Sequence, residues 1–133
     1  MITDKTKRKV ALFLSEFCTK VNVGSGGNAS FPSSTDLDVP LLHTRESTTN
    51  IISSDTTVDF KVSINSSKLV GNTLREIGIF SETMPADDKF DELRAGSSIG
   101  TVDTTMMSRL VFDAIGPIQE NETLNFIYTL EVE

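Results

Sequence analysis

The sequence has few of the residue types that most often carry chemistry. Its 133 residues include one histidine, one cysteine, one tyrosine and no tryptophan. A single cysteine excludes a disulfide within the chain, so the fold does not depend on oxidation. One histidine leaves little scope for a catalytic triad. Sugar sites usually stack on aromatic rings, so the scarcity of tryptophan and tyrosine counts against carbohydrate binding.

Basic residues and long apolar runs are also scarce. Lysine and arginine number 12 against 19 acidic residues, which gives a net charge of −7. Nucleic acids and anionic membranes attract basic faces, so this balance argues against both as partners. No apolar run approaches the roughly 20 residues of a membrane span. With 38% hydrophobic and 23% charged residues, the composition indicates one globular domain with a real core.

What the chain has in quantity is alternation between apolar and polar residues. Residues 57–65 (TVDFKVSIN) and 123–132 (TLNFIYTLEV) alternate cleanly, and we expect both to be strands. Pro40 cannot donate a ladder hydrogen bond, so its segment is expected at a sheet edge. The other expected strands are 36–44, which contains Pro40, and 48–55, 74–80 and 106–115.

The first 21 residues differ from the rest in periodicity. Within 1–21 apolar residues recur at three- and four-residue spacing, which predicts a helix that Thr3 or Asp4 would cap and that Gly24 would follow. The apolar positions are Val10, Phe13, Leu14, Phe17 and Val21.

A β domain is expected to follow the helix. Residues 22–133 would form it, with a Gly- and Ser-rich loop at 22–36 and a long acidic loop at 81–103. One helix followed by several strands predicts a mainly β fold, an antiparallel β-sandwich preceded by one N-terminal α-helix.

Candidates for catalysis or metal binding are weak. His43 has no serine or carboxylate at a recognisable motif spacing, and Cys18 is expected to be a small buried hydrophobe. Asp36 and Asp38 form a D-x-D pair, but without the spacing of a calcium loop. The same holds for an acidic cluster, and we expect the carboxylates of both sets to be solvated. The cluster consists of Asp87, Asp88, Asp91 and Glu92. The sequence therefore predicts no catalytic residue, no cofactor and no metal.

The stretch GNTLREIGIF at 71–80 places two ions inside an apolar strand. Strand alternation puts Leu74, Glu76, Gly78 and Phe80 on one face, opposite Arg75, Ile77 and Ile79.

A carboxylate on an apolar face is costly unless it is paired. Arg109 in MMSRLVF also interrupts an apolar strand, so we predict a structural ion pair between Glu76 and Arg109, within a chain or between chains. The alternative is a Glu76 exposed at the rim of the sheet.

Contacts between chains would use two candidate surfaces. Arg75 and Ile77 lie on the strand face opposite Glu76. The apolar stripe of the helix would anchor the chain to a partner, and its alternative role is ordinary packing against the chain's own core. The candidate interface residues are Phe13, Leu14, Phe17, Arg75 and Ile77.

The order of these elements resembles a known group of proteins. The elements are GSGG (24–27), TDL (35–37), FKVSI (60–64), GNTLREIGIF (71–80), MSRLVFDAI (107–115) and LNFIYTLEV (124–132). Their order resembles small virion structural proteins of tailed viruses, the bacteriophage-like group. It is also similar to the particle-attaching N-terminal regions of tail-fibre and tail-collar proteins, where an R-E-I-G-L-F-like strand is typical.

The similarity covers roughly residues 22–132, more loosely before residue 57, and the chain departs from the pattern in two places. The loop at 81–103 is longer than the pattern has, and Gly116 and Pro117 stand where a basic residue is expected.

The resemblance implies a non-enzymatic building block of a virus particle, at the tail, neck or fibre-attachment region. It would be assembled in the host cytoplasm as a homo-oligomer, with other virion proteins as partners and without nucleic acid or membrane contact. The alternatives are a capsid-decorating (cement or head-fibre) protein, a carbohydrate- or receptor-binding sandwich, and a small hydrolase that uses His43.

Overall fold

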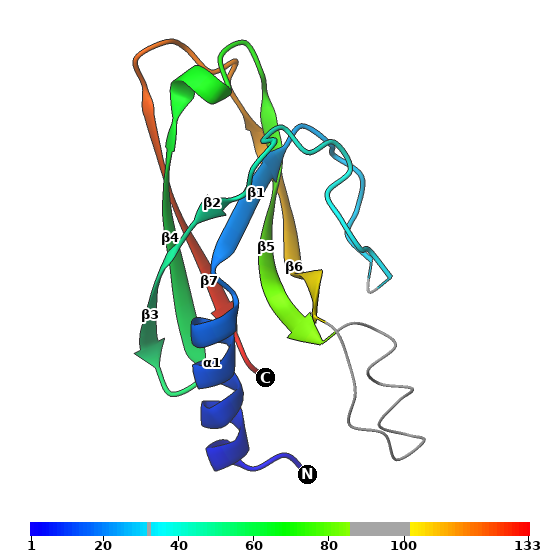
Figure 1. Ribbon diagram of the computed structural model, residues 1–133, viewed down its shortest axis with the longest axis vertical. Coiled ribbons are helices and arrows are strands. Elements are labelled where there is room, and N and C mark those ends of the chain that lie inside the picture. Colours follow the sequence, from blue (N-terminus) through cyan, green and yellow to red (C-terminus); the bar gives the residue numbers. More distant parts are fainter. Residues whose placement is uncertain (32, 86–101) are drawn as a thin grey trace.

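Two antiparallel sheets and one N-terminal helix make up the part of the chain that the computed structural model describes, residues 1–31, 33–85 and 102–133 (Figure 1). The strand order is β2-β1-β5-β6 in one sheet and β3-β4-β7 in the other. The elements are α1 (Asp4–Phe17), β1 (Lys20–Gly24), β2 (Glu46–Ser47), β3 (Thr49–Ser54), β4 (Thr57–Asn65), the 3₁₀ turn η1 (Ser66–Lys68), β5 (Leu74–Pro85), β6 (Val102–Ile115) and β7 (Thr123–Glu131). The predicted mainly β fold, a sandwich preceded by one helix, is confirmed.

Regular alternation builds the inner face of the three-stranded sheet. In β4 the side chains of Val58, Phe60, Val62 and Ile64 are all buried. β4 pairs with β7 without a register shift, which places Phe60 opposite Tyr128 with the ring centroids 6.5 Å apart. A slip of one residue would turn the apolar set toward solvent, so the pattern itself fixes the register.

The four-stranded sheet and helix α1 cover the inner face of the three-stranded sheet and complete the hydrophobic core. Val21 and Val23 of β1 and Ile77 and Ile79 of β5 belong to the same buried cluster. α1 packs on β3, β4 and β5, and buries Leu14 there together with Ala11. No helix among the described residues is long and apolar enough to cross a membrane.

The helix is shorter than predicted. Thr3 caps its start as expected, since its side-chain oxygen accepts a hydrogen bond from the N–H of Thr6. It ends at Phe17, because Cys18 already has an extended backbone that leads into β1. Val21 follows Phe17 at a spacing that also fits a helix, which is why the sequence suggested a longer one.

The predicted edge strand at 36–44 is wrong. This segment makes only an isolated bridge between Pro40 and Gly24, and otherwise runs as a loop. The N–H groups of Asp38 and Val39 bond to a side-chain carboxylate instead of to a neighbouring strand. A loop thus occupies the place where alternation and Pro40 suggested a strand.

β1 and β2 were not predicted, and β1 occupies the end of the predicted helix and the start of the predicted loop 22–36. The other predicted strands are present, and two of them are longer than predicted. β5 continues to Pro85 and β6 begins at Val102, so both ends of the predicted acidic loop 81–103 belong to strands. The middle of that loop, with the acidic cluster, lies in 86–101, outside the described residues.

Candidate functional site

The outer face of the four-stranded sheet, turned away from the core, is covered by the chain between β1 and β2. We call residues 25–31 and 33–41 the covering loop. Leu37 of this loop is buried, and its Cδ2 atom would lie 3.0 Å from a Cβ added at Gly78 of β5. In Figure 1 the loop stands beside β5 and β6, on the side away from β3, β4 and β7. The loop and these two strands enclose the polar groups of the site.

Glu76 points from β5 into the space beneath the covering loop, and its residue is 0% exposed. The predicted division of faces needs one correction. Leu74 belongs to the core cluster with Ile77 and Ile79, and the pairing of β5 with β6 shifts register between Leu74 and Glu76. The rim position considered for Glu76 is therefore excluded by its burial.

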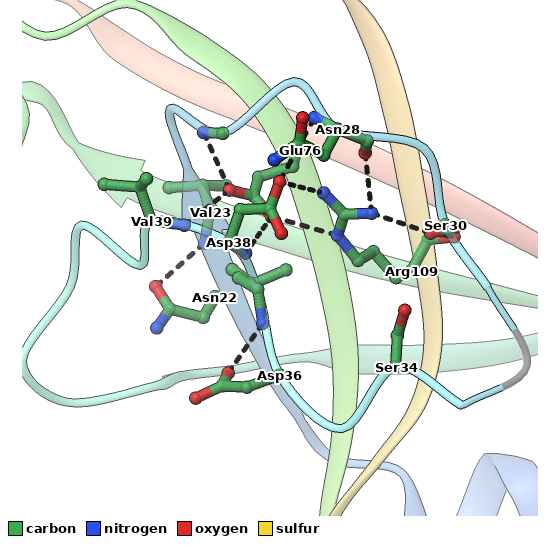
Figure 2. A network of polar contacts seen from close by, with 12 residues as sticks. Asn22, Val23, Asn28, Ser30, Ser34, Asp36, Asp38, Val39, Glu76 and Arg109 are labelled. Carbon is green, nitrogen blue, oxygen red and sulfur yellow. Dashed lines mark hydrogen bonds and ion pairs between the residues drawn. The ribbon is translucent and has the colours of Figure 1, made fainter.

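Four donors bond to the Glu76 carboxylate (Figure 2). Its Oε2 accepts from the N–H of Gly26 at 2.8 Å and of Val39 at 2.9 Å. Its Oε1 accepts from the N–H of Asp38 at 2.8 Å and from Arg109 Nε at 3.0 Å. Three of the four donors are backbone groups of the covering loop, so this side chain holds the loop on the sheet.

The structure brings the predicted partners Glu76 and Arg109 together within one chain. Arg109 lies opposite Gly78 in the register of β5 and β6, and its side chain is 3% exposed. Arg109 is therefore a diagonal neighbour of Glu76, within reach of a long side chain. Its Nη1 also donates to Asn28 O and to Ser30 Oγ, both at 3.0 Å.

Asp38 completes this group, which we call the carboxylate cluster: Glu76, Arg109 and Asp38. Asp38 Oδ2 lies 3.4 Å from Arg109 Nη2 and accepts from the N–H of Asn28 at 3.1 Å. With two carboxylates and one guanidinium, the cluster has a formal charge of −1. Charge neutralisation is thus incomplete, and the backbone N–H groups supply the remaining stabilisation.

The two carboxylates of the D-x-D pair have different partners. Asp36 accepts a hydrogen bond from the N–H of Leu37 at 2.8 Å, whereas Asp38 faces Arg109. Among the described residues, no three His, Cys, Asp or Glu side chains are grouped to hold a metal ion.

Two glycines allow the backbone to approach the carboxylate. A Cβ added at Gly26 would lie 2.2 Å from Asp38 Cβ and 2.5 Å from Glu76 Oε2. A Cβ added at Gly24 would lie 2.5 Å from Val39 O and 2.6 Å from Glu76 Oε2. All four distances are shorter than real side chains allow, so the GSG sequence is a close-approach element rather than a flexible linker.

A second polar side chain fixes the far end of the loop and was missed in the sequence. Asn22 is buried in β1; its Nδ2 donates to Leu42 O, and its Oδ1 accepts from the N–H of Leu42, both at 3.3 Å. Its Oδ1 also accepts from the N–H of Val23 at 2.8 Å. The available signal was a polar residue between two valines in a short apolar stretch.

The two residues considered for nucleophilic or acid–base chemistry lie away from this cluster. His43 is exposed beside Leu41, Leu42, Thr44 and Lys68, none of which could orient it as a base in a triad. Cys18 is 0% exposed, and burial raises the pKa of its thiol to about 11. A thiol with that pKa is protonated at neutral pH and is a poor nucleophile.

The candidate interface residues divide between surface and core. Phe13 is 41% exposed and its ring packs against that of Phe17, with centroids 4.8 Å apart, and Arg75 is exposed. Leu14 and Ile77 are 9% and 4% exposed, so the prediction that they face a partner is wrong: the chain's own core covers them.

An apolar groove of about 430 Å³ opens between the strands β6 and β7. Leu110 and Ile115 of β6 and Ile127 of β7 are among its lining residues, and they are 52%, 44% and 66% exposed. The groove therefore lies between edge strands of the two sheets, on the side of the domain opposite the edge strands β2 and β3.

The carboxylate cluster is suited to holding two parts of the chain together. Its charges and hydrogen bonds hold an irregular loop against a sheet, and both oxygens of Glu76 already accept hydrogen bonds from donors of the chain.

Comparison with known protein families and with curated proteins finds no match for this chain.

Proposed function

We propose that this chain is a non-enzymatic structural building block of a tailed-virus particle, at the tail, neck or fibre-attachment region. The order of its sequence elements supports this role through its resemblance to virion proteins and to the particle-attaching regions of tail-fibre and tail-collar proteins. The geometry of the carboxylate cluster adds a physical reason for that order.

The observation that carries the proposal is that four separated elements of the resemblance meet at one buried point. The GSGG stretch supplies Gly26, the TDL stretch adjoins Asp38, the R-E-I-G strand supplies Glu76 and the M-x-R strand supplies Arg109. Together they hold the covering loop in one shape. A set of residues joined in this way preserves a surface, which is what a protein that must fit repeated neighbours requires.

Exposed apolar side chains offer contact surfaces for such neighbours. Phe13 lies on the helix, and Leu110, Ile115 and Ile127 line the groove between β6 and β7. Isolated exposed apolar residues are common, but a cluster along one groove favours a protein contact. The expected partners are other virion proteins and further copies of this chain, assembled in the host cytoplasm.

Antibody labelling of purified particles tests the proposal. Particles from the source culture are separated on a density gradient, and an antibody against the chain is located on them by gold labelling in electron micrographs. We expect the chain to copurify with particles and the label to lie at the tail, neck or fibre base. Label over the capsid faces would replace this position with the capsid-decorating alternative. Absence of the chain from particles would overturn the virion role.

A further inference from the structure

The four edges of the two sheets differ in how they are protected against pairing with another chain. An edge strand exposes unpaired N–H and C=O groups, and proteins usually guard it by shortness, bulges, proline or charge. β2 has only two residues, and β3 has a register shift after Ile52 and packs against α1. β6 has three register shifts in its pairing with β5. Each of these three edges is short or irregular.

The edge formed by β7 has none of these protections. β7 pairs with β4 along all nine of its residues without a shift, and no described strand pairs with its other edge. Its sequence, TLNFIYTLE, has no proline, glycine or lysine, and its one charge is Glu131 at the end. Ile127 at its centre is 66% exposed. A regular, nearly uncharged edge of this length is a template for another strand.

The sequence of β7 is symmetric in side-chain type about Ile127. Reading outward from Ile127 in both directions gives an aromatic residue, then a short polar residue, then leucine. The pairs are Phe126 with Tyr128, Asn125 with Thr129, and Leu124 with Leu130. In antiparallel pairing of two identical strands, a residue at the two-fold axis faces itself and its neighbours face one another in this order.

We propose that β7 pairs with β7 of a second copy of this chain, antiparallel, around a two-fold axis at Ile127. The two three-stranded sheets would then form one continuous six-stranded sheet. Phe126 of one copy would face Tyr128 of the other, and Leu124 would face Leu130. Cross-strand pairs of this kind stabilise neighbouring strands. Glu131 would face Thr123, so the pairing sets no like charges opposite each other.

The groove between β6 and β7 lies on the same flank and would be covered by the same contact. Leu110 and Ile115 of β6 are half exposed there, and Asp113 is the one charged side chain among the described residues that line it. Such depletion of charge, in a chain with a net charge of −7, is typical of the centre of an interface. The dimer does not require the virion role: a dimer absent from particles would remove the proposed function and leave this contact standing.

Sedimentation of the full chain over a range of concentrations tests the dimer. We expect a monomer–dimer equilibrium in the native chain. Ile127→Lys sets two like charges opposite each other and should raise the dissociation constant at least about tenfold. Ile51→Lys is the matched control, since Ile51 is a 44% exposed isoleucine of the same sheet, on β3. Circular dichroism verifies that both variants fold. A native chain that stays monomeric or forms trimers, or an unchanged dimer in Ile127→Lys, would overturn the proposal.

Cysteine cross-linking tests the register. Asn125 of one copy would face Thr129 of the other, so a mixture of Asn125→Cys and Thr129→Cys should form disulfide-linked dimers under mild oxidation. Neither variant alone should do so, and the native Cys18 is fully buried. A cross-link in either variant alone, or none in the mixture, would show that the axis does not pass through Ile127.

Discussion

Replacing Glu76 with glutamine should strongly destabilise the fold. The amide keeps one oxygen but puts an NH₂ group where the other oxygen stood. In one orientation this group faces the N–H groups of Gly26 and Val39, and in the other it faces those of Asp38 and Arg109. Either way, two buried donors lose their acceptor, and the guanidinium loses its buried counter-charge.

The magnitude follows from these losses. A buried donor left without an acceptor costs about 1–3 kcal/mol, and removing one partner of a buried ion pair costs about 3–5 kcal/mol. The two terms overlap, so we expect Glu76→Gln to lower the free energy of unfolding by about 3–5 kcal/mol. For a chain of 133 residues this corresponds to a fall in Tm of roughly 10–20 °C.

Urea and thermal unfolding followed by far-ultraviolet circular dichroism measure this loss at one protein concentration. Asp55→Asn is the matched control, because it removes a carboxylate from an exposed pair with Arg8, 3.6 Å apart, whose side chains are 62% (Arg8) and 79% (Asp55) exposed. Such a pair contributes less than about 1 kcal/mol. Hydrogen exchange adds a local readout, since the N–H of Gly26 and Val39 should exchange faster in Glu76→Gln. If this variant is no less stable than Asp55→Asn, the stabilising role of the cluster is refuted.

Three further perturbations probe the loop, the helix and the core. Gly26→Ala should destabilise the chain by about 1–3 kcal/mol in urea unfolding, since the added methyl carbon would lie 2.2 Å from a side-chain carbon of the loop. Gly27→Ala, whose nearest neighbour would lie 3.5 Å away, should be nearly neutral, and equal costs would contradict the close-approach role. Phe13→Ser should reduce the number of copies per purified particle, counted by mass spectrometry, whereas Ile51→Ser on β3, at a position 44% exposed, should not; equal counts would refute anchoring by the helix. The Cys18 thiol should be alkylated by iodoacetamide far more slowly in the native chain than in urea at pH 8. Its pKa rises from 9.0 to about 11 on folding, so its contribution to stability is complete below pH 9 and is lost as the pH rises through 11, a decline that Cys18→Ala should make shallower.

The strands that were easiest to predict are those with one face in the core and one in water. β4 was located to the residue at 57–65, because alternation reports this environment directly. β1 was missed for the opposite reason. Val21, Asn22 and Val23 are all buried, since one face meets the core and the other meets the covering loop. Such a strand shows no alternation, and its valines also fit the end of the preceding helix.

The candidate site was predictable only in part, for a related reason. Glu76 and Arg109 each interrupt an apolar strand, and the cost of burying a charge suggested that they pair. The donors of the covering loop carry no such signal, because every residue except proline has a backbone N–H group. Asp38, read as half of a solvated acidic pair, could be placed beside Arg109 only by the three-dimensional path of the loop.

The chemistry of Glu76 explains why a charge occupies a position that an apolar residue could fill. Burying an ion pair gains little net stability over a well-packed apolar pair, so stability alone does not account for it. An apolar side chain, however, cannot accept hydrogen bonds from the N–H groups of Gly26, Asp38 and Val39, which belong to a loop without a strand partner for them. A carboxylate accepts all three and the guanidinium of Arg109 as well. The pair therefore fixes the shape of the outer surface, and exchanging both ions for leucine should release the covering loop even where the sheets remain folded.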